Sequence, residues 1–403
     1  MNRNHYHIVI IGGGAAGLYF AAQPGLSGPC IILEKTGTPG QKLLMSGGGQ
    51  CNLTHDGSIK EFLSYYGENG SCIRSCLYKH NNIDVRNFFQ RLGIPTVVRE
   101  DGKVFPSSMD ARQVVRQLLS AIEKNGISIF CHAGVTGIER RVDGYLISSE
   151  AGTFRTENLI VATGGASYPS TGSDGTFFQV LKRDLGISVI TPRPALVPIY
   201  VEKYPFSSLS GVSIQNVQIK IQCHTFTGDI LFTHRGLSGP VILNHSRSMK
   251  AGTGLEINFL FPYTMDSSIA QMKQDFSGNH KTIETYLSES FHLPRRFVEI
   301  ISRQAGLSQR KTSSLSGSEI RSLSQLLCRN RYSVSGTGGF RQAMITAGGV
   351  SCEEVNLRTM ESKEYPGLYF IGEVLDIDGD TGGYNLQFAF SSAVAAASHI
   401  AGK

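Results

Sequence analysis

Residues 8–22 read IVIIGGGAAGLYFAA, an apolar run followed by glycines and then by a stretch of helical composition. The apolar run predicts a buried β-strand, and Gly12, Gly14 and Gly17 have the G-x-G-x-x-G spacing. Gly12 permits a tight turn, Gly14 lets the backbone approach a pyrophosphate, and Gly17 lets the helix pack closely on the strand. The stretch therefore predicts the phosphate-binding turn of a dinucleotide site.

A second apolar run supports this interpretation. The sequence CIIL at residues 30–33 is followed by Glu34, about twenty residues after the glycines, where an acidic side chain binds an adenosine ribose. A glycine loop alone occurs between many strands and helices. The strand, the glycines, the helix and Glu34 together favour a bound dinucleotide with an adenosine half.

Two later glycine-rich segments return toward the same site. The hairpin pattern of residues 145–165 ends in ATGG, where small residues let the backbone approach a cofactor. The segment GLYFIGEVLDIDGDTGGYNLQFAFSS, residues 367–392, predicts a strand, a loop and a helix that begins near Leu386. The free amides of that helix would face the electron-rich edge of a reduced flavin. These signals indicate FAD.

The order of elements predicts an α/β protein with an insertion. Residues 1–190 and 346–403 alternate between strand and helix patterns, and residues 110–125 predict an amphipathic helix. Residues 191–199, TPRPALVPI, predict a proline-rich crossover. Within the insert, residues 191–345, alternating runs predict antiparallel strands, and residues 265–331 predict a helical excursion.

The composition indicates an ordinary globular protein. The chain has 403 residues, 40% of them hydrophobic, and a formal net charge of +6. It contains neither a signal-peptide pattern nor an apolar run long enough to span a membrane, so we expect a cytoplasmic protein. Eight dispersed cysteines are typical of reduced thiols, and their spacing predicts no metal site.

Basic residues gather between residues 295 and 331, without interleaved aromatics or a known nucleic-acid module. Such a cluster is more often a solvated face, so we expect a small-molecule substrate and neither a nucleic-acid nor a membrane partner. The sequence leaves the oligomeric state open. The cluster consists of Arg295, Arg296, Arg303, Arg310, Lys311, Arg321, Arg329 and Arg331.

Five segments together carry a family resemblance. They are GQKLLMSGGGQCNLT (40–54), ATGGASYPSTGSDG (162–175), LFTHRGLSGPVILNHS (231–246), TAGGV (346–350) and residues 367–392. The chain resembles the bacterial NAD(P)/FAD-dependent oxidoreductases that include aminoacetone oxidases and 3-dehydro-bile-acid reductases. The resemblance implies a Rossmann-type FAD-binding domain, interrupted by an insert with a β-barrel-like part and a helical part. A single nucleotide-binding domain with an insert suits a substrate, or NADH or NADPH as reductant, that visits the flavin transiently.

Cofactor-binding residues carried over by position form one set. It comprises Gly12, Gly14, Ala15, Ala16, Gly17, Glu34, Lys35, Lys42, Ser46, Gly47, Gly48, Gly49, Gln50, Cys51, Asn52, Val135, Thr163, Gly164, Gly165, Gly372, Glu373, Gly382, Gly383, Tyr384, Asn385 and Leu386. The family usually has Arg where this chain has Gln50, so residue 50 itself supplies no fixed positive charge.

Two residues are candidates for catalysis. His234 lies in a polar loop of the insert and titrates near neutral pH, so it could donate a proton or could simply cap the loop. Tyr168 could shape the flavin pocket and donate a hydrogen bond, or it could be a wall residue.

The expected function is passage of hydride through flavin N5, from NAD(P)H or an amine or alcohol donor to an enone-type small molecule or oxygen. The alternative is a flavin-binding regulatory or RNA-associated protein that uses the basic helical insert. Disulfide reductases are excluded, because Cys51 has no nearby cysteine partner and a second nucleotide fingerprint is missing.

Overall fold

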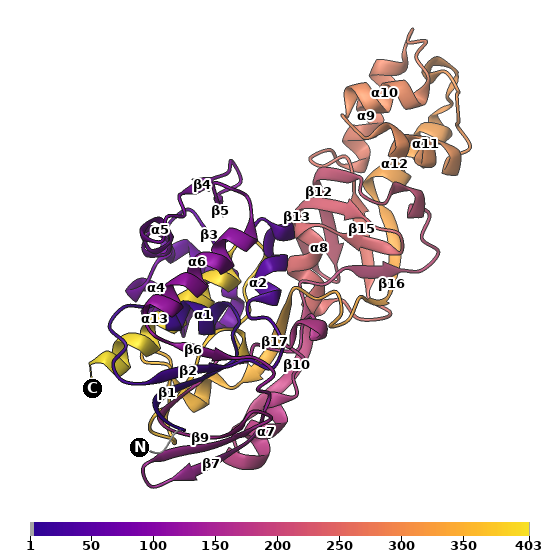
Figure 1. Ribbon diagram of the computed structural model, residues 1–403. Helices are drawn as coiled ribbons and strands as arrows, with labels where there is room; N and C mark the ends of the chain where they lie inside the picture. Colours follow the sequence, from indigo (N-terminus) through magenta and orange to yellow (C-terminus); the bar gives the residue numbers. More distant parts are fainter. Residues whose placement is uncertain (1–3, 403) are drawn as a thin grey trace. The chain divides into compact units, whose positions relative to one another are not determined.

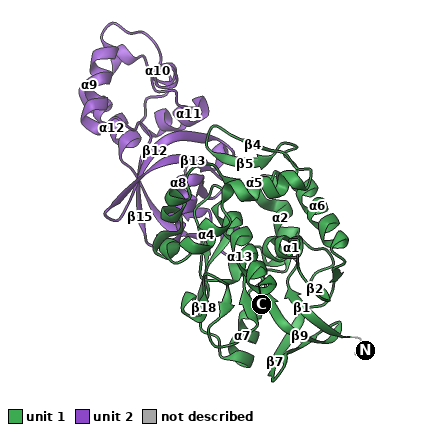
Figure 2. Ribbon diagram, turned by 90° about the vertical axis from the view of Figure 1, so that its left-hand side faces the viewer, with its two compact units in different colours: residues 1–195, 343–403 green, residues 196–342 purple. Residues whose placement is uncertain are grey.

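The computed structural model describes residues 4–402 and forms two compact units (Figures 1 and 2). The first unit comprises residues 1–195 and 343–403, and the second comprises residues 196–342. The insert was expected at residues 191–345, so its limits lie a few residues inside the expected ones.

A parallel sheet forms the centre of the first unit. The order of its strands is β20, β9, β1, β2, β6, and every neighbouring pair is parallel. The ends of β1 and β2 are wholly apolar and buried, as expected for strands covered on both faces. These strands are β1 (His5–Ile11), β2 (Cys30–Leu33), β6 (Ser128–Phe130), β9 (Gly152–Val161) and β20 (Leu368–Phe370).

Antiparallel strands extend this sheet at β9 and β20. The expected hairpin is present as β8 (Gly144–Ser149) and β9, and β7 (Val135–Arg141) pairs with β8. Residues 127–139 read ISIFCHAGVTGIE, a pattern typical of one long strand, but the structure divides this segment into β6 and β7. His132 between them has a φ of +52°, so the chain turns from β2 toward β8. Beyond β20 lie β19 (Glu361–Ser362) and β18 (Val355–Asn356).

Helices of the first unit include the predicted amphipathic one, α6 (Ala111–Lys124). Its N-cap is Asp110, whose carboxylate accepts the Arg112 amide at 2.9 Å, and Val114, Leu118 and Ile122 are buried. The other helices are α1 (Ala15–Ala21), α2 (Gln41–Met45), α3 (Ile59–Phe62), α4 (Arg74–Lys79), α5 (Asn82–Arg91), α7 (Phe177–Leu185) and α13 (Tyr384–Ala401). A small sheet contains β3 (Thr54–His55), β5 (Lys103–Pro106) and β4 (Thr96–Val98).

The proline-rich crossover expected at residues 191–199 is a strand over much of its length. β10 (Val189–Ala195) pairs antiparallel with β17 (Ile345–Val350), with a register shift between Ile190 and Arg193. Prolines fit here because β10 pairs with no strand other than β17 within residues 4–402. The amides on the unpaired side of β10 therefore have no ladder hydrogen bond to donate.

A closed barrel forms the β part of the second unit. Its strands follow one another in the order β11 (Ile199–Val201), β14 (Gly236–Ser238), β13 (His224–Phe232), β12 (Ser213–Ile221), β15 (Gly254–Asn258) and β16 (Asn330–Thr337). Along β12 the apolar side chains that alternate with polar ones are buried, which places them inside the barrel. The helix α8 (Pro240–His245) follows β14.

Four helices form the rest of the second unit. They are α9 (Met265–Phe276), α10 (Ile283–Ser290), α11 (Arg295–Gln304) and α12 (Gly317–Cys328), in the range expected for the helical excursion. Figure 1 shows them grouped beyond β12 and β15.

The carboxamide of Gln387 fixes the long helix α13. Gln387 is fully buried; its Nε2 donates to the His80 carbonyl at 3.0 Å, and its Oε1 accepts from Thr54 Oγ1 at 2.6 Å. The Ser391 hydroxyl donates to the same carbonyl at 2.6 Å. These bonds hold α13 in a fixed position against Thr54 in β3 and against His80 at the end of α4.

Gln387→Met should destabilise the first unit while keeping the side-chain volume. The buried Thr54 hydroxyl would be left without its close acceptor, which costs about 1–3 kcal/mol. Chemical denaturation of the purified protein measures this loss in the free energy of unfolding. Gln325→Met on the exposed face of α12 is the matched control and should leave the unfolding midpoint unchanged. Equal midpoints for both variants would contradict the anchoring role of Gln387.

Candidate functional site

The parallel sheet brings four predicted segments to one edge. Gly12 follows β1 and Glu34 follows β2, while Thr163 and Gly372 lie two residues after β9 and β20. Backbone hydrogen bonds continue past the strands, from Gly12 N to Leu33 O at 2.9 Å and from Ala162 N to Ile11 O at 2.8 Å. Ligands of open α/β sheets bind beyond this carboxyl edge.

The three motif glycines have different surroundings. A Cβ at Gly12, where φ is +102°, would lie 2.5 Å from the Ala162 carbonyl oxygen. A Cβ at Gly17 would lie 2.1 Å from the Gly12 carbonyl oxygen. A Cβ at Gly14 would meet no atom within 4 Å, so this side of the turn is open. Gly12 and Gly17 therefore serve the fold, and Gly14 leaves space that a bound group can occupy.

The Glu34 carboxylate is buried beside this turn. Its Oε2 accepts the Gly13 amide at 2.7 Å, and its Oε1 accepts the Thr36 amide at 2.7 Å and the Thr36 hydroxyl at 2.8 Å. A carboxylate offers about four acceptor positions, so capacity remains for a ribose hydroxyl. The Ala133 amide donates to the Glu34 carbonyl at 2.8 Å, which brings the segment preceding Val135 to the end of β2.

The two predicted lysines bind protein carboxylates. Lys35 Nζ lies 2.6 Å from Asp174 on the surface. Lys42 Nζ lies 2.5 Å from Glu373 Oε2 and 2.5 Å from Ser167 Oγ, in a partly buried cluster.

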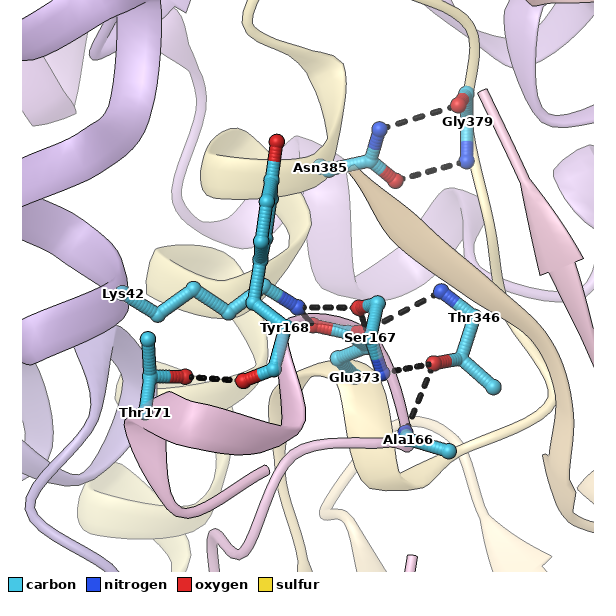
Figure 3. A network of polar contacts seen from close by, with 9 residues as sticks. All are labelled: Lys42, Ala166, Ser167, Tyr168, Thr171, Thr346, Glu373, Gly379 and Asn385. Atoms are coloured by element: carbon cyan, nitrogen blue, oxygen red, sulfur yellow. Dashed lines mark hydrogen bonds and ion pairs between the residues drawn. The ribbon is translucent and has the colours of Figure 1, made fainter. Parts of the chain in front are cut away.

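Figure 3 shows the cluster around Glu373. Ser167 Oγ donates to Glu373 Oε1 at 2.7 Å, and the Thr346 amide donates to the same oxygen at 3.0 Å. The Thr346 hydroxyl accepts the Ala166 amide at 2.8 Å. Lys42 and Glu373 were predicted site residues, whereas Ser167 and Thr346 were not singled out, although both lie in motifs that carry the resemblance. The network ties α2, the loop after β9, β17 and the loop after β20 together.

The loop at residues 46–52 has unusual backbone geometry. Gly47, Gly48 and Gly49 have φ values of +58°, +66° and +88°, and the buried Cys51 has +62°. A non-glycine residue in this region stores strain of about 1–3 kcal/mol, a cost often found at ligand sites. The Oδ1 of Asn52 is buried without a hydrogen-bond partner in the described chain. Burial raises the pKa of Cys51 to about 12, so it is a thiol, not a nucleophilic thiolate.

Gln50 has a cationic neighbour that the sequence does not reveal. Arg99 Nη2 donates to Gln50 Oε1 at 2.7 Å, and the Arg99 guanidinium lies 4.0 Å from the centre of the Phe105 ring. A positive charge therefore lies next to position 50, although residue 50 is neutral.

The remaining glycine loops are tightly packed. A Cβ at Gly165 would lie 2.3 Å from Thr346 Oγ1, and one at Gly383 would lie 2.5 Å from the Thr54 carbonyl oxygen. α13 begins at Tyr384, two residues before the expected Leu386. The Asn385 side chain is engaged with Gly379, accepting its amide at 2.8 Å and donating to its carbonyl at 2.9 Å (Figure 3).

Tyr384 itself is a packing residue. Its buried ring stacks on Tyr65 at 4.2 Å and on His55 at 5.2 Å between ring centres.

Two other predicted glycines, Gly164 and Gly382, have positive φ values of +71° and +132°.

The two catalytic candidates occupy different units. Tyr168 has a left-handed backbone, φ +54°, and its carbonyl accepts the Thr171 amide at 2.9 Å; burial raises the pKa of its phenol. His234 lies exposed in the turn between β13 and β14 of the second unit. Thr233 closes that turn, since its amide and hydroxyl both donate to the Gly236 carbonyl at 2.9 Å. The capping role considered for His234 thus belongs to Thr233.

These residues fit FAD in three respects. Gly14 leaves an open cradle, Glu34 has acceptor capacity next to it, and Asn52 presents a buried oxygen without a partner. Gly12, Gly14, Glu34 and the loop at residues 46–52 would hold the dinucleotide. Among residues 4–402, no group of three His, Cys, Asp or Glu side chains could hold a metal ion.

Comparison with known proteins decides the family. The family described as "HI0933-like protein Rossmann domain" matches residues 6–399. The chain belongs to this family. Membership confirms the predicted FAD-dependent oxidoreductase with a Rossmann-type domain, and the barrel confirms the β part of the insert.

Relatives within the family align over nearly their full length. The "Ribosomal RNA dihydrouridine synthase" of Haemophilus influenzae is 36% identical, covering 97% of this chain and 98% of the relative. The protein of the same name from Escherichia coli is 32% identical, covering 98% of each. The "3-dehydro-bile acid delta(4,6)-reductase" of Clostridium scindens is 29% identical, covering 97% of this chain and 97% of the relative.

Solved structures show the same fold at low identity. A quinol-fumarate reductase with menaquinol has a TM-score of 0.55 at 13% identity, covering 100% of this chain and 72% of that one. A 3-ketosteroid delta1-dehydrogenase from Sterolibacterium denitrificans has a TM-score of 0.53 at 12% identity, covering 99% and 100%. Between residues 4 and 402, this member of the family has no helix that is long and apolar enough to cross a membrane.

Gly14→Val should lose FAD while the apoprotein keeps its melting temperature. The new side chain enters open space in the protein but fills the cradle. Flavin released on denaturation, identified as FAD or FMN by chromatography, measures occupancy. Gly17→Ala is the contrast, because its Cβ would meet the Gly12 carbonyl and lower apoprotein stability itself. Normal FAD content in Gly14→Val would refute the assignment of the cradle.

Proposed function

We propose that the protein is an FAD-dependent reductase that saturates a carbon–carbon double bond conjugated to a carbonyl group, and that its substrate is a uridine in ribosomal RNA. We infer the substrate from the end-to-end similarity to two relatives that are named for forming dihydrouridine in ribosomal RNA. At 36% and 32% identity, both are more similar to this chain than the bile-acid reductase is.

The names of the three relatives describe one type of reaction. Uracil has its C5=C6 bond conjugated to the C4 carbonyl, and a 3-dehydro bile acid with Δ4 and Δ6 unsaturation has double bonds conjugated to its C3 carbonyl. Saturating the C5=C6 bond of uracil or the Δ4 bond of the bile acid adds a hydride at the carbon remote from the carbonyl and a proton at the carbon next to it, and the Δ6 bond accepts hydride at the far end of the same conjugated system. This explains how one fold serves both substrates.

Bound FAD would supply the hydride, with NADH or NADPH as the proposed source of electrons. The protein must then supply the proton and exclude water. Tyr168 suits proton donation because burial raises its pKa above the usual 10, so the phenol stays protonated at neutral pH. His234 suits it because a ring nitrogen of an imidazole can donate a proton, its side chain is exposed, and Thr233, not His234, holds the turn.

RNA as substrate departs from the expectation of a small molecule, which stays a prediction. The charge cluster of residues 295–331 was the only sequence feature that pointed to nucleic acid, and a relative's name now adds a specific reason. A flavin-binding protein that associates with RNA without reducing it remains the alternative class.

The purified holoprotein, given NADH or NADPH, should form dihydrouridine in ribosomal RNA transcribed without modifications. Mass spectrometry of the digested RNA measures a gain of two hydrogens at uridine. The same assay run with a 3-oxo-Δ4 steroid tests the small-molecule alternative. Steroid reduction with unmodified RNA would refute the RNA substrate and retain the reaction type. RNA binding without any reduction would favour the regulatory alternative.

Removing the proton donor should slow substrate reduction without changing flavin content. For the residue that donates, Tyr168→Phe or His234→Ala should lose about 10²–10⁴-fold in the rate of substrate reduction, while flavin reduction by the nicotinamide stays normal. Stopped-flow absorbance separates the two half-reactions. If Tyr168 donates, the decline in rate that its ionisation causes should have its midpoint above pH 10, the usual pKa of a phenol. Unchanged rates in both variants would exclude both residues.

A further inference from the structure

The positive charge of the protein is carried by the second unit. Residues 196–342 contain sixteen Lys and Arg against nine Asp and Glu, whereas the first unit contains twenty-two against twenty-three. The first unit is therefore close to neutral, and the net charge of +6 arises from the insertion. A nearly neutral nucleotide-binding fold with a basic insertion is a feature that cofactor binding does not explain.

Charge is also divided within the four-helix part. The segment of α9 and α10, residues 265–290, contains two basic and four acidic residues. The segment of α11 and α12, residues 295–331, contains eight basic and two acidic residues. The basic charge is thus concentrated on one pair of helices.

Both acidic residues of the α11–α12 segment are already paired inside it. Glu319 binds Arg310, and Glu299 lies 3.4 Å from Arg295. Arg331 is paired with Glu256 at 2.6 Å. The charges within each of these pairs cancel, and the other basic side chains are left without local compensation.

Five basic side chains of the segment remain. Arg296 donates to the Ser208 carbonyl, and we call the other four the basic helical face. They are exposed, and none makes an ion pair or side-chain hydrogen bond within residues 4–402. On α12, Arg321 and the exposed Gln325 lie one turn apart on the side opposite the buried Leu323 and Leu327, and Arg329 directly follows the last residue of the helix. The basic helical face consists of Arg303, Lys311, Arg321 and Arg329.

We propose that the basic helical face binds the phosphate backbone of the RNA substrate. This inference rests on the proposed function for its choice of polyanion. Four arginine and lysine side chains without aromatic neighbours suit contact with phosphates, which position an RNA without reading its bases. Base-stacking sites instead need exposed aromatic rings, and on α11 the aromatic Phe297 is buried. The face therefore contributes affinity and orientation, and the reading of the target uridine lies elsewhere.

The test compares two triple variants of the full-length holoprotein. One is Arg303→Gln, Arg321→Gln and Arg329→Gln. The control is Arg116→Gln, Lys124→Gln and Arg358→Gln, which removes the same charge from exposed residues of the first unit that form no ion pair. Binding of a labelled, unmodified ribosomal RNA fragment is measured from 50 to 300 mM KCl, together with flavin content and melting temperature.

The face variant should bind RNA roughly tenfold or more weakly at low salt, and the slope of log affinity against log salt should fall by about one for each phosphate that the variant no longer neutralises. The control should bind within about twofold of the wild type, since long-range charge effects are screened in salt. Both should keep normal flavin content and melting temperature. For dihydrouridine formation, the face variant should raise KM without lowering kcat.

Failure of this inference and failure of the proposed function give different results. If the wild type forms dihydrouridine and the face variant binds RNA like the control, the basic helical face is not the docking surface and the function stands. If RNA binds through the face but no uridine is reduced, the inference holds and the proposed function fails. A wild type that does not bind RNA overturns the inference.

Discussion

The carboxyl end of β1 has no room for side chains, and the nucleotide site depends on that constraint. β9 approaches Gly12 from one side and α1 approaches from the other, so a methyl group at Gly12 or Gly17 would meet backbone oxygens at 2.5 Å or 2.1 Å. Because β2 and β9 pair parallel with β1, the carboxyl ends of the three strands share one edge. Glu34 can then bind the Gly13 amide and remain beside the open space at Gly14.

Structural elements that depend on a local sequence pattern could be predicted. Apolar periodicity and a good N-cap identified α6, and turn residues identified the hairpin of β8 and β9. The glycine spacing placed the turn after β1, because the need for glycine there arises within a few residues of chain. The helical part of the insert was visible for the same reason. The prediction of a crossover at the proline-rich segment was wrong over much of its length. The segment is a strand because it pairs with β17, some 150 residues away in the sequence.

Contacts between distant segments were not predictable from one sequence. Nothing in the sequence says that Lys42 pairs with Glu373, or that Ser167 lies between them; the fold brings these groups together. Arg99 likewise reaches Gln50 only because of where the fold places its loop. The charge of the site therefore cannot be read from the identity of residue 50 alone. The sequence alone also does not decide whether His234 donates a proton or caps its loop. Only the structure shows that Thr233 is the residue that closes this turn.

The antiparallel pairing of β10 and β17 has a consequence for how the chain is assembled. Ala195, the last residue before the second unit, is paired with Ile345, soon after the chain returns. Paired residues of antiparallel strands have Cα atoms about 4.5–5.5 Å apart, so the points of departure and return are neighbours. A short turn could join them and leave the first unit as one continuous chain. The barrel and its helices are thus an insertion at one point of the first unit, and the strand order of the nucleotide-binding sheet does not depend on them.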